Sequence, residues 1–392
     1  MTFAANLLLL AIALPAVAAC AYLLLLTALS QRVAPMAPRS RALKFDIIVP
    51  AHNEASVIER TVASLRKLDW PPDGFRILVI ADNCTDQTAA LARLAGATVL
   101  ERQDPSLRGK GYALNFAFRS SREQAWADAV IVVDADAEVS SNLAAAFAAR
   151  IESGVHAIQA HYGILNPMAS WRTRLITIAK ASFHIVRSRA RESMKLSCGI
   201  RGNGWCVTHA LLNQVPYQAY SLTEDLEFGI DIGLAGFRVA YADEAHSNAE
   251  MVTDEKIAGT QRRRWESGRF QLIRSRTLPL LLAAIRRGDA VCFDLAIDLM
   301  VLPLSYVTLN VLLLLGASLV AVYWGLAHVV WVWIAVACAA GLLAYVLRGW
   351  QLSGIGARGV FDLARAPAFL IWKVILMLRP GTQGWVRTDR EK

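Results

Sequence analysis

The sequence predicts an α/β fold, in which a mostly parallel sheet is joined to helices that cross a membrane or lie on its surface. Short apolar runs alternate with helical patterns between Phe45 and Arg276, which is the signature of βαβ units. Hydrophobic residues make up 55% of the 392 residues, and the mean hydropathy of +0.37 is high for a soluble protein. We therefore divide the chain into a membrane helix at residues 1–30, a soluble domain at residues 45–276, and membrane-associated helices at residues 277–392.

The net charge of +9 indicates that the binding partners are negatively charged. Basic residues concentrate in residues 187–201, in residues 256–276 and in the C-terminal third, where they suit anionic lipid or a phosphate-bearing substrate. The sequence contains no nucleic-acid motif, so we expect no nucleic-acid partner. The six cysteines form neither a CxxC pair nor a His/Cys cluster, which argues against a zinc site or a disulfide framework and fits a reducing compartment.

The first segment, Thr2–Leu29, is almost wholly apolar and long enough to cross a bilayer. A signal peptide is the alternative, because Val17–Cys20 resembles a lipoprotein cleavage site. Against it, no Lys or Arg precedes the apolar run, and the run continues past Cys20. Four basic residues follow the run: Arg32, Arg39, Arg41 and Lys44. The positive-inside rule then places the N-terminus outside and the soluble domain in the cytoplasm, so we predict a multi-pass protein of the inner (plasma) membrane.

Short β-branched runs predict the strands of the soluble domain, and longer amphipathic stretches predict its helices. The expected strands are Phe45–Val49, Phe75–Ile80, Thr98–Leu100, Ala129–Val133 and Ala157–Ala160. The expected helices are Ser56–Lys67, Gln87–Ala95, Lys110–Arg119 and Ser141–Ile151.

Polar residues gather where three of these strands end, in the loops Pro50–Glu54, Asp82–Asp86 and Asp134–Asp136. Ligands of an open α/β sheet bind at this edge. A glycine-rich basic segment, Arg108–Gly111, precedes a helix, and its Lys110 can meet a phosphate. Neither GxGxxG nor GKS/T is present, so a Rossmann dinucleotide site and a P-loop are both unsupported.

Asp134 and Asp136 follow a buried strand and are separated by one small residue. Two hard oxygen ligands at this edge suit Mg²⁺ or Mn²⁺ shared with substrate phosphates. The alternative is a solvated turn after a strand, because Asp-x-Asp is a common pattern.

The C-terminal third returns to the membrane. Thr277–Asp298 mixes apolar and charged residues, which suits a helix in the membrane interface. Leu299–Tyr323 and Val329–Leu347 are long apolar candidates for spanning helices. Phe369–Leu378 is short and contains Lys373, so we expect it in the interface, with residues 381–392 in the cytoplasm. The chain would then have three spans.

A set of motifs in a fixed order resembles glycosyltransferase family 2, with its GT-A nucleotide-sugar domain. The motifs are VPAHNE (Val49–Glu54), ADNCTD (Ala81–Asp86), RGKGYALN (Arg108–Asn115), DAD (Asp134–Asp136), TED (Thr223–Asp225) and QRRRW (Gln261–Trp265). The last two resemble the TED and QxxRW motifs of the membrane-bound branch, which contains cellulose, chitin and hyaluronan synthases and ceramide glucosyltransferases.

The resemblance implies a donor site for a UDP-sugar. Asp82 would hold the uracil and ribose, and three residues would lie near the donor: Pro50, Glu54 and Lys110. Asp134 and Asp136 would hold the metal ion that bridges the diphosphate and stabilises the leaving UDP as a Lewis acid. For Asp82 alone, a helix N-cap is the competing interpretation.

The resemblance also implies the catalytic and acceptor residues. Asp225 would be the general base, with Glu224 beside it, although N-cap and dipole chemistry after Thr223 also accounts for acids at a helix start. Three residues would close over the site and its donor: Gln261, Arg264 and Trp265. A basic membrane-surface helix at residues 256–276 is compatible with that role. Trp205 and Trp265 are candidates to stack on an acceptor sugar, and core packing is the alternative for Trp205. His161, His184 and His246 have no ligand spacing and receive no role.

A single displacement on an α-linked donor would invert the anomeric centre and give a β-glycoside. Three spans are few for a polysaccharide channel, so we expect transfer to a membrane-held acceptor. The first candidate is a lipid-linked glycan of exopolysaccharide assembly, and the proteins of that assembly would then be partners of this one. Transfer to ceramide or a glycerolipid comes second, and a processive polysaccharide synthase third. From other classes, we retain a sugar nucleotidyltransferase, which would need a triphosphate cradle, and a catalytically silent membrane scaffold.

Overall fold

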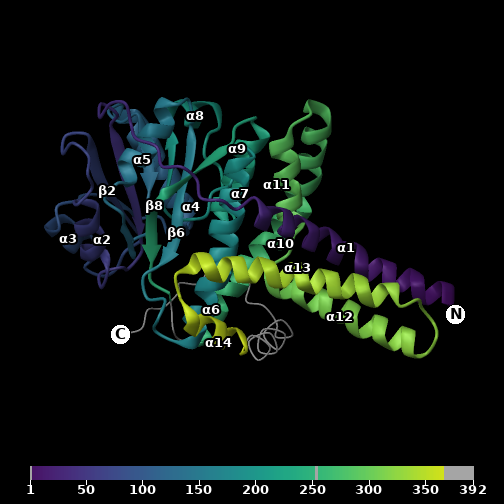
Figure 1. The fold of residues 1–392 in the computed structure, drawn as a ribbon. Helices are drawn as coiled ribbons and strands as arrows, with labels where there is room; N and C mark the ends of the chain where they lie inside the picture. Colours follow the sequence, from purple (N-terminus) through teal and green to yellow (C-terminus); the bar gives the residue numbers. More distant parts are fainter. Residues whose placement is uncertain (1, 252–254, 366–392) are drawn as a thin grey trace.

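The structure is a computed structural model that describes residues 2–251 and 255–365, without the side chains of residues 255–263. An eight-stranded sheet in the order β3-β2-β1-β4-β7-β6-β8-β5 forms the core of the α/β part (Figure 1). The strands are β1 (Phe45–Ala51), β2 (Phe75–Asp82), β3 (Thr98–Arg102), β4 (Ala129–Val132), β5 (Ala137–Val139), β6 (Ala157–Ile164), β7 (Trp205–Thr208) and β8 (Val239–Ala249).

The sheet has a parallel half and a mixed half. Strand β1 pairs in parallel with β2 and β4, and β2 pairs in parallel with β3, as the alternation of strands and helices predicted. Strand β7 runs antiparallel to both β4 and β6, and β5 runs antiparallel to β8, while β6 and β8 are parallel. Four of the seven pairings are therefore parallel, and the sheet as a whole is mixed.

Helices cover both faces of the sheet because its strands are apolar on both sides. Ile47 faces a cluster that includes Val62 and Phe147, whereas its neighbour Ile48 faces a cluster that includes Phe118 and Phe228. The first face is covered by α2 (Ile58–Leu65) and α5 (Leu143–Glu152), and the second by α4 (Lys110–Gln124), α8 (His209–Gln214) and α9 (Glu224–Leu234). Helix α3 (Thr88–Leu94) completes the expected set. Burial of both faces explains why β1, β2 and β4 read as near-continuous hydrophobic runs.

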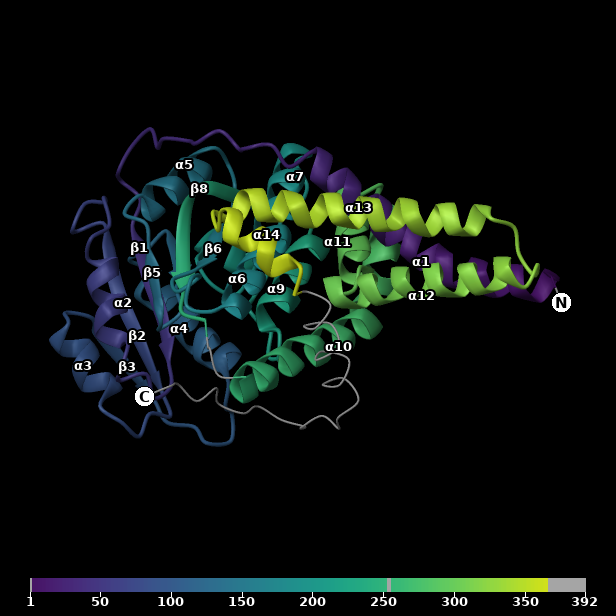
Figure 2. The ribbon, with the colours of Figure 1, turned by 60° about the horizontal axis from the view of Figure 1, so that its bottom comes forward.

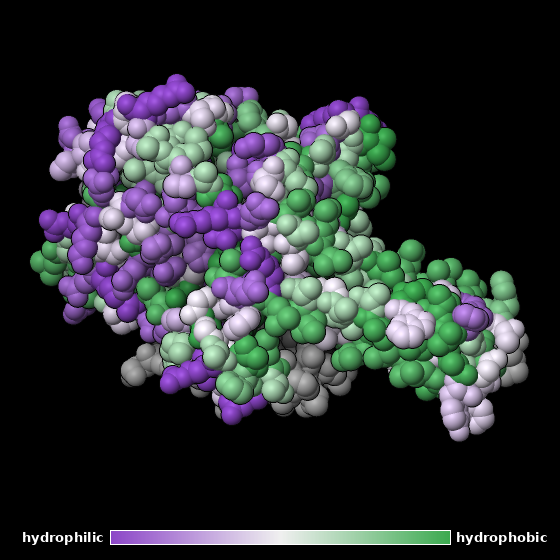
Figure 3. Space-filling view, in the orientation of Figure 1, coloured by the Kyte–Doolittle hydropathy of each residue, from purple (hydrophilic) through white to green (hydrophobic). Residues whose placement is uncertain are grey.

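Within the described residues, three helices are long and apolar enough to cross a membrane: α1 (Thr2–Ala28), α12 (Leu304–Tyr323) and α13 (Val330–Ser353). They match the three predicted spans and pack together around a shared apolar cluster. The bundle projects away from the sheet, with the start of α1 and the α12–α13 turn at its far end (Figures 1 and 2). On the face shown in Figure 3, the surface of the bundle is mostly hydrophobic, whereas the surface over the sheet is largely hydrophilic.

The predicted interfacial helix at Thr277–Asp298 is not one helix. The long helix α10 (Glu255–Arg287) ends just before Gly288. Helix α11 (Ala290–Met300) begins after Asp289, which accepts hydrogen bonds from the backbone N–H groups of the first turn of α11. Asp294 and Asp298 are buried rather than directed to lipid headgroups. The expected segments Phe369–Leu378 and 381–392 lie outside the described residues.

A helical segment that the sequence analysis did not identify connects the sheet to the bundle. It consists of α6 (Trp171–Lys180), a π-helical turn η1 (Ala181–Val186) and α7 (Arg187–Ser193). Helix α13 packs closely against η1, because a Cβ atom on Gly349 would lie 1.9 Å from Ser182 Oγ. The short helix α14 (Ala357–Leu363) lies beside α6 (Figure 2).

Candidate active site

The DAD loop begins where β4 ends, at the edge of the sheet that the sequence predicted. The Asp134 backbone N–H donates to Asn203 Oδ1 at 3.0 Å, which ties the loop to the glycine-rich segment before β7. Asn203 is fully buried, and its Oδ1 also accepts from Ser247 Oγ at 3.0 Å. Asn203 therefore fixes the first carboxylate of the loop through the backbone.

Lys110 connects the DAD loop to the TED motif. As the first residue of α4, it donates from Nζ to Asp134 Oδ1 at 2.5 Å and to the Gly202 carbonyl oxygen at 2.6 Å. Its Nζ also lies 4.0 Å from Glu224 Oε1. Burial lowers the pKa of Lys110, but the carboxylates of Asp134 and Glu224 outweigh burial and raise the pKa overall. The ammonium group therefore stays charged between the two loops.

Glu224 and Asp225 are the first two residues of α9, where the backbone N–H groups of a helix start favour negative charge. Burial is the main cause that raises the pKa of both carboxyl groups, and the charge of Asp225 helps to raise the pKa of Glu224 to about 7. Lys110 opposes both shifts. Two carboxyls with raised pKa values beside one cation are typical of an acid–base site.

Gly202 allows the chain to pass directly beside Asp225. Its φ of +87° favours glycine, and a Cβ atom at this position would lie 3.2 Å from Asp225 Oδ2. The glycine-rich segment before β7 therefore borders the candidate base.

The N-cap alternative for the TED motif fails at Thr223, because Thr223 makes no side-chain capping hydrogen bond and its hydroxyl is buried without a partner. Helix α10 approaches this residue closely, since a Cβ atom on Gly268 would lie 2.7 Å from Thr223 Cγ2. The TED motif and the helix that carries the QRRRW motif are thus in contact.

Asp82 lies at the end of β2 and is 6% exposed. It caps no helix, because α3 begins only at Thr88. Its Oδ1 accepts from Arg102 Nη1 at 2.5 Å, and Arg102 is its partner across the β2–β3 ladder. No sequence motif indicates Arg102 as a site residue, because only the register of β2 and β3 brings it beside Asp82.

The loop after β1 lies against the Asp82 loop. Pro50 is within β1, and His52 Nδ1 is 2.7 Å from the Asp82 carbonyl oxygen. Asn53 adopts a φ of +57°, and the Glu54 backbone N–H donates to Thr88 Oγ1 at 2.7 Å. Pro50, Glu54 and Asp82 therefore share one edge of the sheet, as expected for a common ligand.

Two further residues face the DAD loop and were missed by the sequence analysis. Lys180 Nζ lies 3.4 Å from the centre of the Tyr162 ring. Burial lowers the pKa of Lys180 to about 7, against the opposing charges of Asp134 and Asp136. Burial and the same two aspartates raise the pKa of the Tyr162 hydroxyl. No local motif marks these residues, because β6 and α6 bring them to the site from outside the recognised motifs.

Of the QRRRW motif, Arg264 is partly buried and Trp265 is 41% exposed, both on α10. Gln261 lies outside the residues whose side chains are described.

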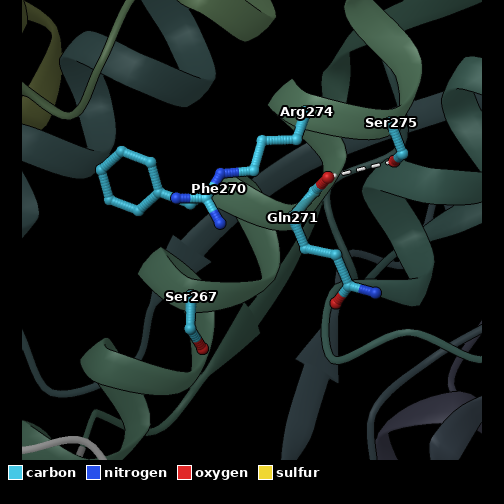
Figure 4. Close-up of a pocket in the computed structure, with 5 residues that line it drawn as sticks. All are labelled: Ser267, Phe270, Gln271, Arg274 and Ser275. Atoms are coloured by element: carbon cyan, nitrogen blue, oxygen red, sulfur yellow. Dashed lines mark hydrogen bonds between the residues drawn. The ribbon is translucent and has the colours of Figure 1, made fainter.

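An open hollow of about 580 Å³ lies on helix α10 beyond this motif and is lined by Ser267, Phe270, Gln271, Arg274 and Ser275 (Figure 4). This hollow is separate from the carboxylates, and we assign it no role.

The expectation that Trp205 stacks on an acceptor is wrong. The ring is 1% exposed and packs against Phe118 and Phe228 in the core. Trp205 begins β7, a strand inside the sheet, so its side chain has no access to a sugar. Core packing, the alternative from the sequence, is confirmed.

The donor set of the DAD loop fits a divalent ion. Asp134 and Asp136 offer carboxylate oxygens from one loop, and no third His, Cys, Asp or Glu of the described chain completes a metal-holding group with them. Mg²⁺ is commonly held by one or two carboxylates together with substrate phosphates. Two protein ligands therefore suit an ion that shares its coordination with a diphosphate.

The chain is similar in sequence to a known protein family and to several of its members. A profile described as "Glycosyltransferase like family 2" matches residues 42–268. A beta-monoglucosyldiacylglycerol synthase of Synechocystis sp. is 28% identical over 240 residues, which is 57% of this chain and 47% of that protein. The cellulose synthase 1 catalytic subunit of Komagataeibacter xylinus is 29% identical over 92 residues, covering 23% of this chain and 12% of that protein. This chain spans about half the length of the first of these curated relatives.

A solved structure shares the fold. The mannosyltransferase PcManGT from Pyrobaculum calidifontis, in complex with GDP-Man and Mn²⁺, superimposes with a TM-score of 0.52 at 18% identity and covers 89% of this chain and 99% of that chain. The sequence match extends over more than half of the chain and includes Lys110, the DAD loop and the TED motif. The chain therefore has the GT-A fold and belongs to glycosyltransferase family 2.

Proposed function

We propose that this protein is an inverting membrane-bound glycosyltransferase that moves a sugar from a UDP-sugar to a membrane-held acceptor and forms a β-glycoside. The observation that carries the proposal is Lys110, whose Nζ bonds the DAD loop and lies 4.0 Å from Glu224 of the TED motif. It brings the expected diphosphate end of the donor and the expected base into one site. The three spanning candidates support an acceptor held in the membrane.

The donor would lie along the edge formed by the ends of β1, β2 and β4. Asp82, held by Arg102, would accept hydrogen bonds from the uracil or the ribose. Asp134 and Asp136 would hold a divalent ion, which supplies Lewis-acid stabilisation of charge on the leaving UDP. Lys110, and Lys180 when protonated, add positive charge beside that diphosphate.

Asp225 would accept the proton of the acceptor hydroxyl. The hydroxyl oxygen forms a bond to the anomeric carbon as the bond from that carbon to the diphosphate oxygen breaks, and UDP leaves. Burial raises the pKa of Asp225 and makes it a stronger base than an exposed aspartate. Because the base and the leaving group lie on opposite sides of the anomeric carbon, its configuration inverts.

For the acceptor, our first candidate is a polyprenyl-diphosphate-linked glycan in exopolysaccharide assembly, because the three spanning candidates in the described part of the chain leave little wall for a polymer channel. A second candidate is a glycerolipid or ceramide acceptor. The 28% identity with a beta-monoglucosyldiacylglycerol synthase favours this second candidate. A processive synthase is third.

The test is incubation of the purified full-length protein with labelled UDP-sugars and membrane lipid extract, followed by organic extraction and sizing of the product. We expect a single labelled glycolipid with Mg²⁺ or Mn²⁺, absent with Asp225→Asn. A polymer of increasing length would identify a processive synthase instead. Labelled nucleotide-sugar formed from a sugar phosphate and UTP would identify a nucleotidyltransferase, and no transfer to any extract would favour a silent scaffold.

A further inference from the structure

Four arginines lie together where the catalytic part meets the membrane bundle, and we call them the arginine cluster: Arg187, Arg191, Arg201 and Arg269. Each is at least nine-tenths buried. All four act on Asp298, because burial raises the pKa of this carboxyl but their charges together hold it well below its usual range. The cluster is therefore one electrostatic unit.

Two carboxylates neutralise only part of this charge. Asp298 Oδ1 accepts from Arg187 Nη1 at 2.7 Å and lies 2.7 Å from Arg191 Nη2. Asp294 Oδ2 accepts from Arg191 Nε at 2.8 Å. Four guanidinium groups against these two carboxylates leave two positive charges over, and Asp225 lies close enough to Arg201 to offset part of that excess.

The excess charge coincides with unused hydrogen-bond donors. Nε and Nη2 of Arg201 are both buried without a partner, as are Arg191 Nη1 and Arg269 Nε. The Arg201 guanidinium lies over the Phe183 ring, with its central carbon 4.2 Å from the centre of the ring. Burial of unpaired charges and donors is costly, so this arrangement calls for an anion with several acceptor oxygens.

The position of the cluster connects the catalytic carboxylates to the membrane. Arg201 precedes Gly202, which touches Asp225, and the charge of Arg201 lowers the pKa of Asp225 against the effect of burial. Arg269 follows Gly268, the residue that abuts Thr223 of the TED motif. On the other side, Arg187 Nε donates to the Tyr345 hydroxyl of α13, and Arg191 Nη2 donates to the Tyr22 hydroxyl of α1.

We propose that the arginine cluster binds the phosphate or diphosphate group of the acceptor lipid, so that the enzyme selects an anionic, phosphate-bearing acceptor over a neutral one. The proposal rests on the proposed function, since it assumes that Asp225 faces the acceptor. A phosphate group offers several acceptor oxygens and carries up to two negative charges, which matches the unused donors and the excess charge. Guanidinium groups bind such oxygens in pairs through their fork of N–H groups.

The test uses the full-length protein in nanodiscs of phosphatidylcholine, with polyprenyl diphosphate or polyprenol added. We expect polyprenyl diphosphate to raise the unfolding temperature, because it binds the folded protein alone, and polyprenol to leave it unchanged. Polyprenyl diphosphate should also inhibit transfer to the lipid extract competitively.

Arg201→Gln and Arg269→Gln should weaken polyprenyl diphosphate binding by about 10- to 100-fold, the range of a lost charge-assisted hydrogen bond. Arg286→Gln removes an exposed positive charge from the same helix as Arg269 and serves as the matched control, with binding unchanged. Calorimetric titration with UDP should give wild-type affinity in all three variants, which shows that they are folded. The comparison of polyprenyl diphosphate with polyprenol on the wild-type protein remains decisive if a variant does not fold.

Equal stabilisation by polyprenol, or wild-type binding by Arg201→Gln and Arg269→Gln together, would overturn the proposal. Equal protection by phosphatidylglycerol nanodiscs without the polyprenyl lipid would also overturn it, because the anion would then be an ordinary bilayer headgroup. So would cluster-dependent binding that leaves transfer uninhibited, because the lipid would then be structural. Absence of transfer to any acceptor would count against the proposed function, whereas the binding measurements would still decide the role of the cluster.

Discussion

At the scale of residues, Lys110 is the cation that connects the carboxylates of the DAD loop and the TED motif. Lys110 bonds Asp134 and the Gly202 carbonyl, and it opposes the raised pKa values of Glu224 and Asp225. A base that is buried but still able to ionise near neutral pH requires such a neighbour.

Asp225→Asn keeps the shape of the side chain and removes the proton acceptor. Transfer should fall by about 10²- to 10⁴-fold, the usual contribution of general-base catalysis, while UDP affinity stays close to wild type. Asp82→Ala should instead weaken UDP binding first. Asp231→Asn, on the same helix α9, is the matched control and should transfer normally. Each variant is measured by calorimetric titration with UDP and by a transfer assay. Normal transfer by Asp225→Asn would show that Asp225 is not the base, and Glu224 would become the next candidate.

The pH dependence of transfer follows from the same residue. Because the pKa of Asp225 is raised, chiefly by burial, the base becomes protonated at a higher pH than an ordinary aspartate. The transfer rate should therefore fall on acidification, with its inflection above the usual range of aspartate. The pH–rate profile of the wild type measures this inflection, and a flat profile down to the usual range would contradict it.

Glu224 should make the folded state less stable as the pH rises. Its folded pKa of about 7 exceeds the ordinary value of 4.5, so its contribution to stability is complete below the ordinary value and lost as the pH rises through about 7. Glu224→Gln removes this loss and should raise the free energy of unfolding at pH 8 by on the order of 1–3 kcal/mol. Denaturant unfolding at pH 5 and pH 8 measures the difference, with exposed Glu59→Gln as the control. An identical loss of stability in wild type and Glu224→Gln would contradict the prediction.

Metal removal should abolish transfer, because without the ion the carboxylates of Asp134 and Asp136 would face the negatively charged diphosphate directly. Excess chelator should stop the reaction, and added Mg²⁺ or Mn²⁺ should restore it. Asp136→Ala should weaken Mn²⁺ binding in the presence of UDP, measured by calorimetry independently of turnover. Full transfer in excess chelator is the result that would refute the metal site.

At the scale of elements, the sequence was most informative where a strand is buried on both faces. Strands β1, β2 and β4 were predicted from apolar runs, and the loops after them share one edge of the sheet because parallel strands end together. Strand β8 was not predicted, since its second half, Asp243–Asn248, is polar and acquires its strand partners from β5 and β6. Residues such as Arg102 and Lys180 join the site only through register and packing, which a local pattern does not encode.

The contact between α13 and η1 gives a test at this scale. Ser182 of the π-helical turn lies so close to Gly349 that a Cβ atom on Gly349 would overlap Ser182 Oγ. Gly349→Ala should therefore lower stability by about 1–3 kcal/mol through overpacking. Gly316→Ala on α12 meets no atom within 4 Å and should be neutral or stabilising by up to about 1 kcal/mol. Thermal unfolding in one detergent compares the two, and equal effects would contradict the close approach.

At the scale of the whole molecule, the bundle sets the expected orientation in the membrane. The start of α1 and the α12–α13 turn lie at the same end, away from the sheet (Figure 1). With basic residues after α1, we predict that both lie outside and that the glycosyltransferase part lies in the cytoplasm. A tag at Met1 or in the turn at residues 324–328 should be accessible to protease on intact cells. A tag in the loop at residues 71–74 should be protected, and cleavage there would reverse the orientation.

The hydrogen-bond partners of Arg187 and Arg191 also determine which truncated fragments of the protein can fold. A fragment limited to residues 42–268, the part that matches the family, retains both arginines. It loses Tyr22, Asp294, Asp298 and Tyr345, which supply their described hydrogen bonds. Two desolvated cations would then be left without counter-charges at a freshly exposed apolar surface. Soluble expression of this fragment should therefore yield aggregated material, and preparations for structural work need the membrane helices and a detergent or lipid environment.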